Sequence, residues 1–299
     1  MRLLEDASGE LGRLDAASAG APESIQTALR LGTIAELACL DSRQPTTSFD
    51  RLAAAEGDPL HDAALPASIL HWRDLLVAEE ARMRGGAVLS APRFAVVAPT
   101  LASYPDRPRL EAIWREPGLA RPVLHRALDS AAWAPDVALG EATAALLLCA
   151  GGCAEQTRLL PFADVAPAER AAAVAEWRGD RKERWTLLGL AAVARRARRV
   201  RLAIDEAVHS LPAEDARLDE LGRAAITARR ALAELRRVFV TSMPALSQAL
   251  ELSKPAASDA LDRLVSADLA RELTARARDR VFAYEAACGV ATTLAPTSS

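Results

Sequence analysis

The sequence predicts a mostly α-helical protein with two domains, an N-terminal helical bundle and a shorter C-terminal domain that also contains strands. Three observations support this fold class. The chain has 299 residues, 51% of them apolar, which is enough for a large core and favours two domains over one. Alanine, leucine and arginine dominate, and all three favour helices. After about residue 239, helical periodicity gives way to short helices and then to an alternating pattern.

Helices are predicted along most of the chain before that point, because apolar residues recur at helical spacing between good start and stop residues. Ser48 precedes one helix that ends at Gly57, and Pro22 lies at the start of another. The segment 139–149 is apolar nearly all round, which predicts a helix in the centre of the bundle. The expected helices cover residues 2–17, 22–40, 48–57, 66–86, 107–117, 120–133, 140–152, 166–211 and 216–242.

The composition shift divides the chain into three parts. We expect the helical bundle in residues 1–217, the second domain in 218–288 and a disordered tail in 289–299, which ends in "TTLAPTSS". The N-terminus has no apolar core of a signal peptide, and no run of about 18 apolar residues occurs that would cross a membrane. The expected location is therefore the cytoplasm.

Charge and cysteine content limit the possible partners. The formal net charge is −3, so any affinity for nucleic acid must come from a local basic patch. Cys149 and Cys153 are four residues apart but lack histidines at ligand spacing, and a zinc site needs four such ligands. We expect no bound metal and no cofactor, and we interpret the cysteines as small buried residues of a reducing compartment.

The stretch from residue 242 to 268 has the pattern of a helix-turn-helix. Ser242 or Thr241 can cap a first short helix, and Ser253 can cap a second one, "KPAASDALDRLVSAD". A tight turn between them requires apolar residues on the facing sides of both helices. The residues expected to face inward are Leu246, Ala249, Leu250, Leu252, Ala257, Leu261, Leu264 and Val265.

The residues that follow predict a β-wing. The stretch "DLARELTARARDRVFAY" has the pattern strand, turn, strand, with arginines in the turn. The whole region therefore predicts a winged helix-turn-helix that binds double-stranded DNA, with the second helix in the major groove and the wing on phosphates. The expected DNA-contacting residues are Ser253, Lys254, Ser258, Asp259, Arg276, Arg278 and Arg280.

Two features leave a structural or protein-binding role open for this domain. Glu251, Asp259 and Asp262 place negative charge near the surface that would face phosphates. Winged helices also serve for packing, dimerisation or protein contact. The run "ARRARRVR", with Arg195, Arg196, Arg198, Arg199 and Arg201, is interpreted as a solvated helix face, with contact to DNA phosphate or to an acidic partner as the alternative.

The C-terminal stretch "ALSQALELSKPAASDALDRLVSADLARELTARARDRVFAYE" resembles the winged helix found at the end of many bacterial Fic-family proteins. The resemblance extends, less specifically, over most of the chain. "LLEDASGELGRLDAAS" is similar to their opening helix, and "IAELACLDSRQPTTSFDRLAAAEG" resembles the segment that carries their inhibitory glutamate. "RPVLHRALDSAAWAPDVALGEATAALLLCAGG" takes the place of their catalytic helix-loop-helix. The resemblance implies a Fic-like bundle before the winged helix.

Departures from the family motif imply that its chemistry is lost. Fic enzymes transfer AMP or a related group with the motif His-Pro-Phe-x-(Asp/Glu)-Gly-Asn-Gly-Arg-x-x-Arg. The corresponding stretch here is "PDVALGEATAAL", which has no histidine and, at Gly140, a single glycine. Thr143 and Leu146 replace the arginines, and His125 lies upstream on the preceding helix. The resemblance therefore implies a pseudoenzyme.

These observations lead to one main hypothesis and two alternatives. The main hypothesis is a DNA-binding transcriptional regulator that acts as a homodimer, with a catalytically inactive Fic-like bundle for dimerisation or for sensing a small-molecule or protein effector. The first alternative is a nucleotidyl transferase with an altered active site, which would bind ATP and Mg²⁺. The second is an interaction protein whose winged helix contacts protein.

Overall fold

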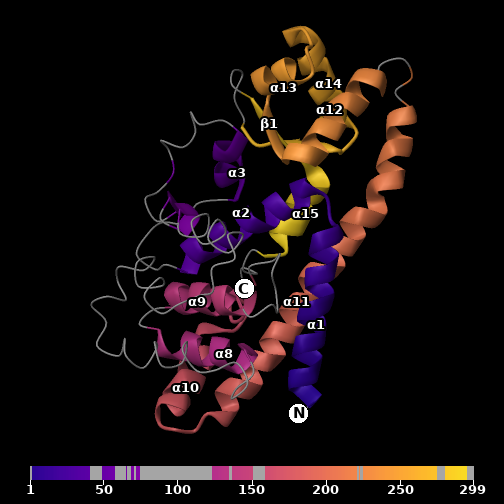
Figure 1. Ribbon diagram of the computed structural model, residues 1–299. Coiled ribbons are helices and arrows are strands. Elements are labelled where there is room, and N and C mark those ends of the chain that lie inside the picture. Colours follow the sequence, from indigo (N-terminus) through magenta and orange to yellow (C-terminus); the bar gives the residue numbers. More distant parts are fainter. Residues whose placement is uncertain are drawn as a thin grey trace.

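A computed structural model of the chain describes residues 2–40, 49–57, 65, 69–70, 72–74, 123–134, 137–150, 159–220, 222, 225–274 and 280–294. Its elements, in chain order, are α1 (Arg2–Gly20), α2 (Glu23–Leu40), α3 (Phe49–Gly57), α8 (Val123–Trp133), α9 (Val137–Ala150), α10 (Pro167–Arg178), α11 (Glu183–Asp219), α12 (Ala225–Val238), β1 (Val240–Ser242), α13 (Met243–Ala249), α14 (Lys254–Ser266), β2 (Ala270–Glu272), β3 (Val281–Tyr284) and α15 (Glu285–Thr292). The prediction of a mostly α-helical protein is confirmed (Figure 1). The helices expected over 66–86 and 107–117 lie mostly or wholly outside the described residues.

The 37-residue helix α11 runs along one side of the molecule, and α1 packs against it (Figure 1). Near its start, the Trp185 ring stacks on Phe162 with ring centroids 4.1 Å apart. The Trp185 indole also donates to the carbonyl of Leu128, and the Trp177 indole donates to Asp129. These two buried donors therefore fix α8 against α10 and α11 while satisfying their own hydrogen-bonding needs.

Helix α9 lies in the interior of the helical body, defined here as helices α1 to α11, as its nearly uniform apolar sequence predicts. Buried side chains project from it on several sides, including Leu139, Ala142 and Leu148. Gly140 lies within this helix, not in a loop. A Cβ at Gly140 would come within 2.8 Å of the carbonyl oxygen of Ala131, so glycine allows α8 and α9 to pack closely.

The C-terminal module, defined here as residues 225–284, contains a three-stranded antiparallel sheet with the strand order β1-β3-β2. Val240 pairs with Ala283, and Glu272 pairs with Phe282. The strand expected at residues 281–284 is present as β3, and all four of its side chains are buried. The reason is that α3 covers the second face: a Cβ at Gly57 would lie 2.5 Å from Val240.

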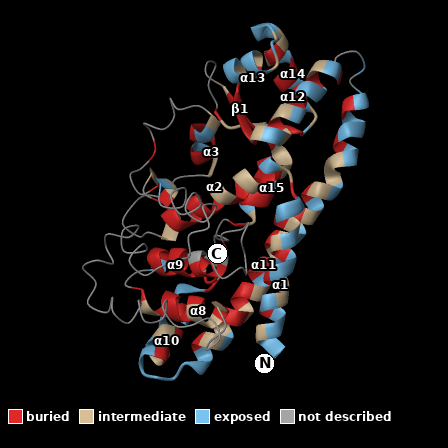
Figure 2. Cartoon of the chain, viewed as in Figure 1, coloured by how far each residue is buried: buried red, intermediate tan, exposed pale blue. Residues whose placement is uncertain are grey.

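The chain after β3 corrects the prediction of a disordered tail over 289–299. Residues 289–292 belong to α15, a turn follows at 293–294, and residues 295–299 lie outside the described part. Val290, Ala291 and Leu294 are buried, and α15 packs on α2 and α11. The hydrophobic core is therefore continuous between the helical body and the module (Figure 2).

The arginine run on α11 is only partly the solvated face that its spacing predicts. Arg195 and Arg198 are exposed, but Arg196 is completely buried. Its guanidinium forms an ion pair with Glu36 of α2 and donates to Asp164, 2.8 Å away, and to the carbonyl oxygen of Leu294 at 3.2 Å. A buried guanidinium keeps its charge and therefore requires acceptors on several sides.

A second buried ion pair lies beside the first one. Glu141 of α9 is fully buried, its two carboxylate oxygens share the backbone N–H of Phe162, and it pairs with Arg170 at 3.0 Å. Burial raises the pKa of Glu141, and it raises the pKa of Glu36 to about 8, although Arg196 acts in the opposite direction. The neighbouring charges of Glu141 and Asp164 raise the Glu36 pKa further.

Two kinds of feature are absent from the described residues. No helix there is long and apolar enough to cross a membrane. No group of three or more metal-ligating side chains occurs in the same part of the chain.

Glu36→Gln is expected to flatten the pH dependence of stability between about pH 5 and pH 8. The folded-state pKa lies above the ordinary value of 4.5, so folded protein holds a proton that the unfolded chain releases in this range. The stabilisation is fully present below the ordinary pKa and is lost as pH rises through about 8. Urea denaturation across this range measures the slope, which one such group changes by at most about 1.4 kcal/mol per pH unit.

Glu10→Gln is the control for this experiment. A hydrogen bond from Arg13 lowers the pKa of Glu10, so its contribution changes at lower pH. Equal slopes for Glu36→Gln and the unmodified protein would contradict the assignment of the raised pKa to Glu36.

Candidate nucleic-acid interface

The first short helix of the module, α13, begins as the sequence predicts. The Ser242 hydroxyl accepts from the backbone N–H of Ala245 at 3.4 Å, and Pro244 lies in the first turn. Leu246 is fully buried, as expected. Ala249, however, is exposed, because Met243, Leu246 and Leu250 define the packed side of this seven-residue helix and Ala249 lies at its edge.

The turn between α13 and α14 is held by side chains as well as by its backbone. Glu251 adopts a left-handed conformation with φ 53°, which reverses the chain. The Ser247 hydroxyl donates to the carbonyl of Leu252 at 2.6 Å. Arg230 of α12 donates to the carbonyl of Leu250 at 2.6 Å, where a cation also interacts favourably with the end of α13. The turn therefore fixes the angle between the two helices.

Helix α14 packs on the module through one face and leaves the other accessible. Ser253 caps it, accepting from the backbone N–H of Ala256 at 3.4 Å. At its far end, Arg217 of α11 donates to the carbonyl of Ala267 at 3.3 Å. Val265 is only partly buried, and the fully buried face consists of Ala257, Ala260, Leu261 and Leu264.

The predicted DNA-contacting residues of α14 lie on its outer side, with one exception. Ser253, Lys254 and Asp259 are exposed near the start of the helix. Ser258 is half-buried, and its hydroxyl donates to Asp262 at 3.3 Å. Ser253, Lys254 and Asp259 are therefore accessible to a partner, while Ser258 already has a partner within α14.

Arg280 occupies a different position from the one its sequence context predicts. Its guanidinium donates to Asp262 of α14 and to Glu272 of β2, each at 2.8 Å, and lies over the Phe282 ring. Hydrogen bonds to the two carboxylates raise the pKa of Arg280. Arg280 therefore connects α14 to the base of the β2–β3 hairpin and is not a free phosphate-binding cation. Arg276 and Arg278 lie outside the described residues.

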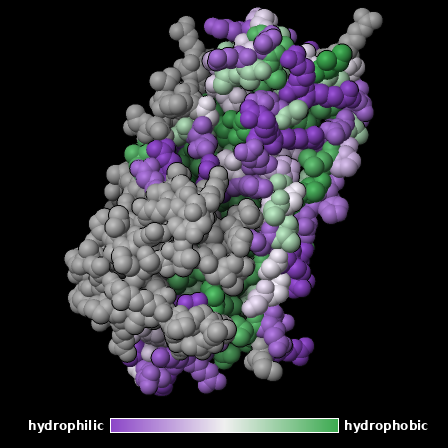
Figure 3. Space-filling view, in the orientation of Figure 1, coloured by the Kyte–Doolittle hydropathy of each residue, from purple (hydrophilic) through white to green (hydrophobic). Residues whose placement is uncertain are grey.

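Most cations of the described module likewise form ion pairs, some of them with carboxylates just outside the module. Arg229 pairs with Asp219, Arg237 with Glu234 and Arg271 with Glu285. Lys254 and Arg263, both on α14, form no ion pair within the described part of the chain. The face of the module seen in Figure 3 is dominated by hydrophilic residues (purple). Free positive charge in this part of the module is therefore concentrated on α14.

Comparison with known proteins assigns no family. No protein-family model matches the chain, and no curated protein is similar enough in sequence to match it. Function is therefore inferred from the residues of the interface themselves.

Ser253→Ala is expected to lower the free energy of unfolding by about 1 kcal/mol, because it removes the side-chain acceptor at the start of α14. The matched control is Ser266→Ala at the other end of the same helix. There the hydroxyl donates to the carbonyl of Asp262, a bond that contributes little to helix stability. Urea denaturation of both variants measures the difference, and equal effects would contradict the capping role.

Proposed function

We propose that residues 225–284 form a winged helix-turn-helix and that the protein binds double-stranded DNA through α14. The observation that carries the proposal is the order of elements, α12-β1-α13-α14-β2-β3, together with the strand order β1-β3-β2. A helix-turn-helix places its second helix in the major groove and supports it with the first. Here α13 and α14 pack on one another, and the outer side of α14 is free.

The start of α14 is the part of the module best suited to contact DNA, both at phosphates and at base edges. The N-terminal end of a helix presents unpaired backbone N–H groups and a partial positive charge, which favour phosphate oxygens. Lys254 adds a full charge at this end, and Ser253 and Asp259 supply a hydroxyl and a carboxylate that can contact bases. This combination supports sequence reading by α14.

A small set of cations in the module would bind the DNA phosphates. Arg280 is neutralised by Asp262 and Glu272, so it positions the hairpin between β2 and β3. In the described part of the module, Lys254 and Arg263 on α14 remain for phosphate, and the sequence between β2 and β3 adds Arg276 and Arg278 to the proposal. With so few cations, one module binds weakly, and we propose that two copies bind two half-sites as a homodimer.

The helical body is assigned a regulatory role in this proposal. We propose a cytoplasmic transcriptional regulator whose body has the Fic-like order of segments without Fic chemistry and serves dimerisation or effector sensing. The stretch that takes the place of the catalytic loop supports this view, because residues 137–150 form one continuous helix. The backbone N–H groups inside such a helix are used by its own hydrogen bonds and cannot bind phosphate.

A second candidate function is contact with a basic protein surface through the same face of α14. The observation that favours it is the exposed carboxylate of Asp259 near the start of α14. Carboxylates on this face repel DNA phosphates and attract lysine and arginine side chains. The two functions differ in their response to DNA, which the following experiment measures.

Arg278→Ala and Lys254→Ala are expected to affect DNA binding differently. Fluorescence anisotropy would follow the full-length protein on a duplex enriched from a random pool and on a scrambled duplex, over a salt series. Arg278→Ala should weaken binding to both duplexes and reduce the salt slope by about one. Lys254→Ala should change the preference between the duplexes.

Arg178→Ala is the matched control, because Arg178 is exposed on α10 at the opposite end of the molecule (Figure 1). It should bind like the unmodified protein. Absence of binding to any duplex at low salt would contradict the DNA proposal and favour protein contact by α14.

A further inference from the structure

The central strand of the module continues into the helical body without a linker. Tyr284 is the last residue of β3, and Glu285 is the first residue of α15. The backbone N–H of Tyr284 donates to the carbonyl oxygen of Phe239 at 2.9 Å, and the backbone N–H of Glu285 donates to the carbonyl oxygen of Leu269 at 3.2 Å. The last residue of the sheet and the first of the helix are therefore fixed to two different parts of the module.

The junction between β3 and α15 is also held by charged groups. The Tyr284 hydroxyl donates to Glu214 of α11 at 2.7 Å, and Arg236 of α12 donates to the same carboxylate oxygen at 2.8 Å. Arg271 of β2 pairs with Glu285. Glu214 is buried, and its hydrogen-bond partners lie on β3, on α12 and, through Ser210, on its own helix, so the start of α15 cannot move without breaking this cluster.

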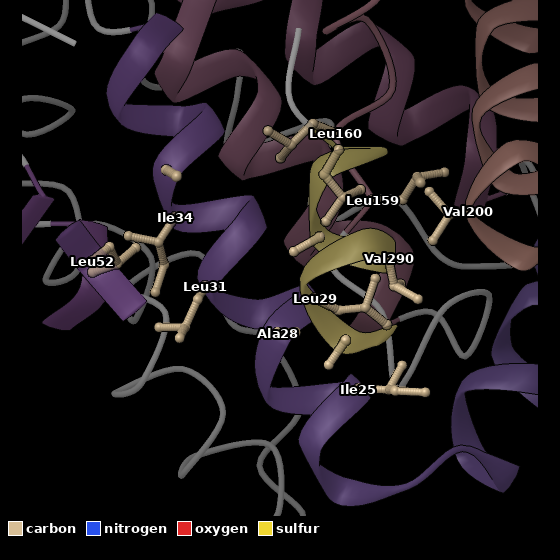
Figure 4. Close-up of a cluster of buried hydrophobic side chains, with 14 of the residues drawn as sticks. Ile25, Ala28, Leu29, Leu31, Ile34, Leu52, Leu159, Leu160, Val200 and Val290 are labelled. Atoms are coloured by element: carbon tan, nitrogen blue, oxygen red, sulfur yellow. The ribbon is translucent and has the colours of Figure 1, made fainter. Parts of the chain in front are cut away.

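The other end of the C-terminal strap, defined here as residues 285–294, is held inside the body. Arg196 donates to the carbonyl of Leu294, and the Leu294 side chain covers Gly32 of α2. A Cβ at Gly32 would lie 2.9 Å from Leu294 and 3.4 Å from the carbonyl oxygen of Ala291. Val290 of the strap lies between Leu29 of α2 and Val200 of α11 (Figure 4).

Movement of the strap would be transmitted to α14 through β3 and Arg280. The strand β3 pairs with both other strands, so a shift of β3 displaces the whole sheet. Arg280 precedes β3 directly and binds Asp262 on the outer face of α14. Packed elements of this kind move as units and do not deform continuously.

We propose that the C-terminal strap is a conformational device through which the helical body controls the geometry of the module. Docked between α2 and α11, the strap holds β3 and the hairpin in their present arrangement. When the strap is released from Gly32 and Arg196, β3 and the hairpin are held less firmly. The structural coupling stands on the contacts above, and its consequence for DNA rests on the proposed function.

The test is a substitution in the helical body that inserts a larger side chain beneath the strap, called the wedge here. Gly32→Leu introduces a side chain where Leu294 now packs, and it leaves every residue of the module and of the strap unchanged. Gly12→Leu on α1 is the matched control, because a Cβ at Gly12 meets no atom within 4 Å. Leu294→Ala provides a second, milder release that removes the same contact from the strap side.

Hydrogen exchange of the full-length protein gives the first result. The wedge and Leu294→Ala should each lower protection about tenfold or more in residues 287–294 and also in β3 and β2, whereas Gly12→Leu should not. Loss of protection confined to the strap would overturn the proposal. Unchanged strap protection in both variants would overturn it too, because the Gly32–Leu294 contact would then not hold the strap.

Anisotropy on the enriched duplex gives the second result. If the unmodified protein binds, Gly32→Leu should change its affinity about tenfold while Gly12→Leu does not. Equal affinity of the two variants, despite loosened strands, would overturn control of DNA binding. If no form of the protein binds DNA, the proposed function fails, while the exchange result still decides whether the strap controls the module.

Discussion

The buried guanidinium of Arg196 is the interaction on which the arrangement of the chain depends. It cannot lose its proton, so an apolar interior accepts it only with negative charge and acceptor atoms close by. Those partners are Glu36 of α2, Asp164 before α10 and the Leu294 carbonyl after α15. The three distant segments must therefore meet at one point on α11. Removing one partner would leave part of this buried charge without compensation, which destabilises the fold.

This junction explains why the helical body and the module share one core. The chain leaves the body along α11, forms the module and returns through β3 and α15 to the same helix α11. The Tyr284–Glu214 and Leu294–Arg196 hydrogen bonds attach the returning segment at both of its ends. Among the described elements, the part of the module farthest from these attachments is the α13–α14 pair, at the upper end of the molecule (Figure 1). Its outer face is accordingly free for a partner.

Local signals in the sequence predicted local structure well. The caps Ser242 and Ser253, the buried residues Leu246 and Leu261, and the exposed residues Lys254 and Asp259 all follow from short-range periodicity and capping chemistry. The strand at 281–284 was predicted by its β-branched and aromatic residues, but not the burial of both its faces, because α3 covers the sheet from far along the chain.

Long-range charge pairing accounts for what the sequence could not predict. Glu36 and Arg196 are 160 residues apart, and nothing in the run "ARRARRVR" distinguishes the buried arginine from its exposed neighbours. Arg280 has the context of a wing arginine until the fold brings Asp262 and Glu272 to it. The segment 289–294 is short and rich in small residues, which is typical of a tail, yet Val290 and Leu294 are buried by α2 and α11.

Hydrogen exchange of the unmodified protein, with and without a bound duplex, tests most directly the claim that α14 is a DNA-reading surface supported by the body. We predict slower exchange at residues 253–259 on adding DNA, accompanied by slower exchange in the strap at 285–294. Exchange in α10, at the opposite end of the molecule, should not change. Unchanged exchange in α14 under conditions where the duplex is bound would contradict a DNA-reading role for this helix.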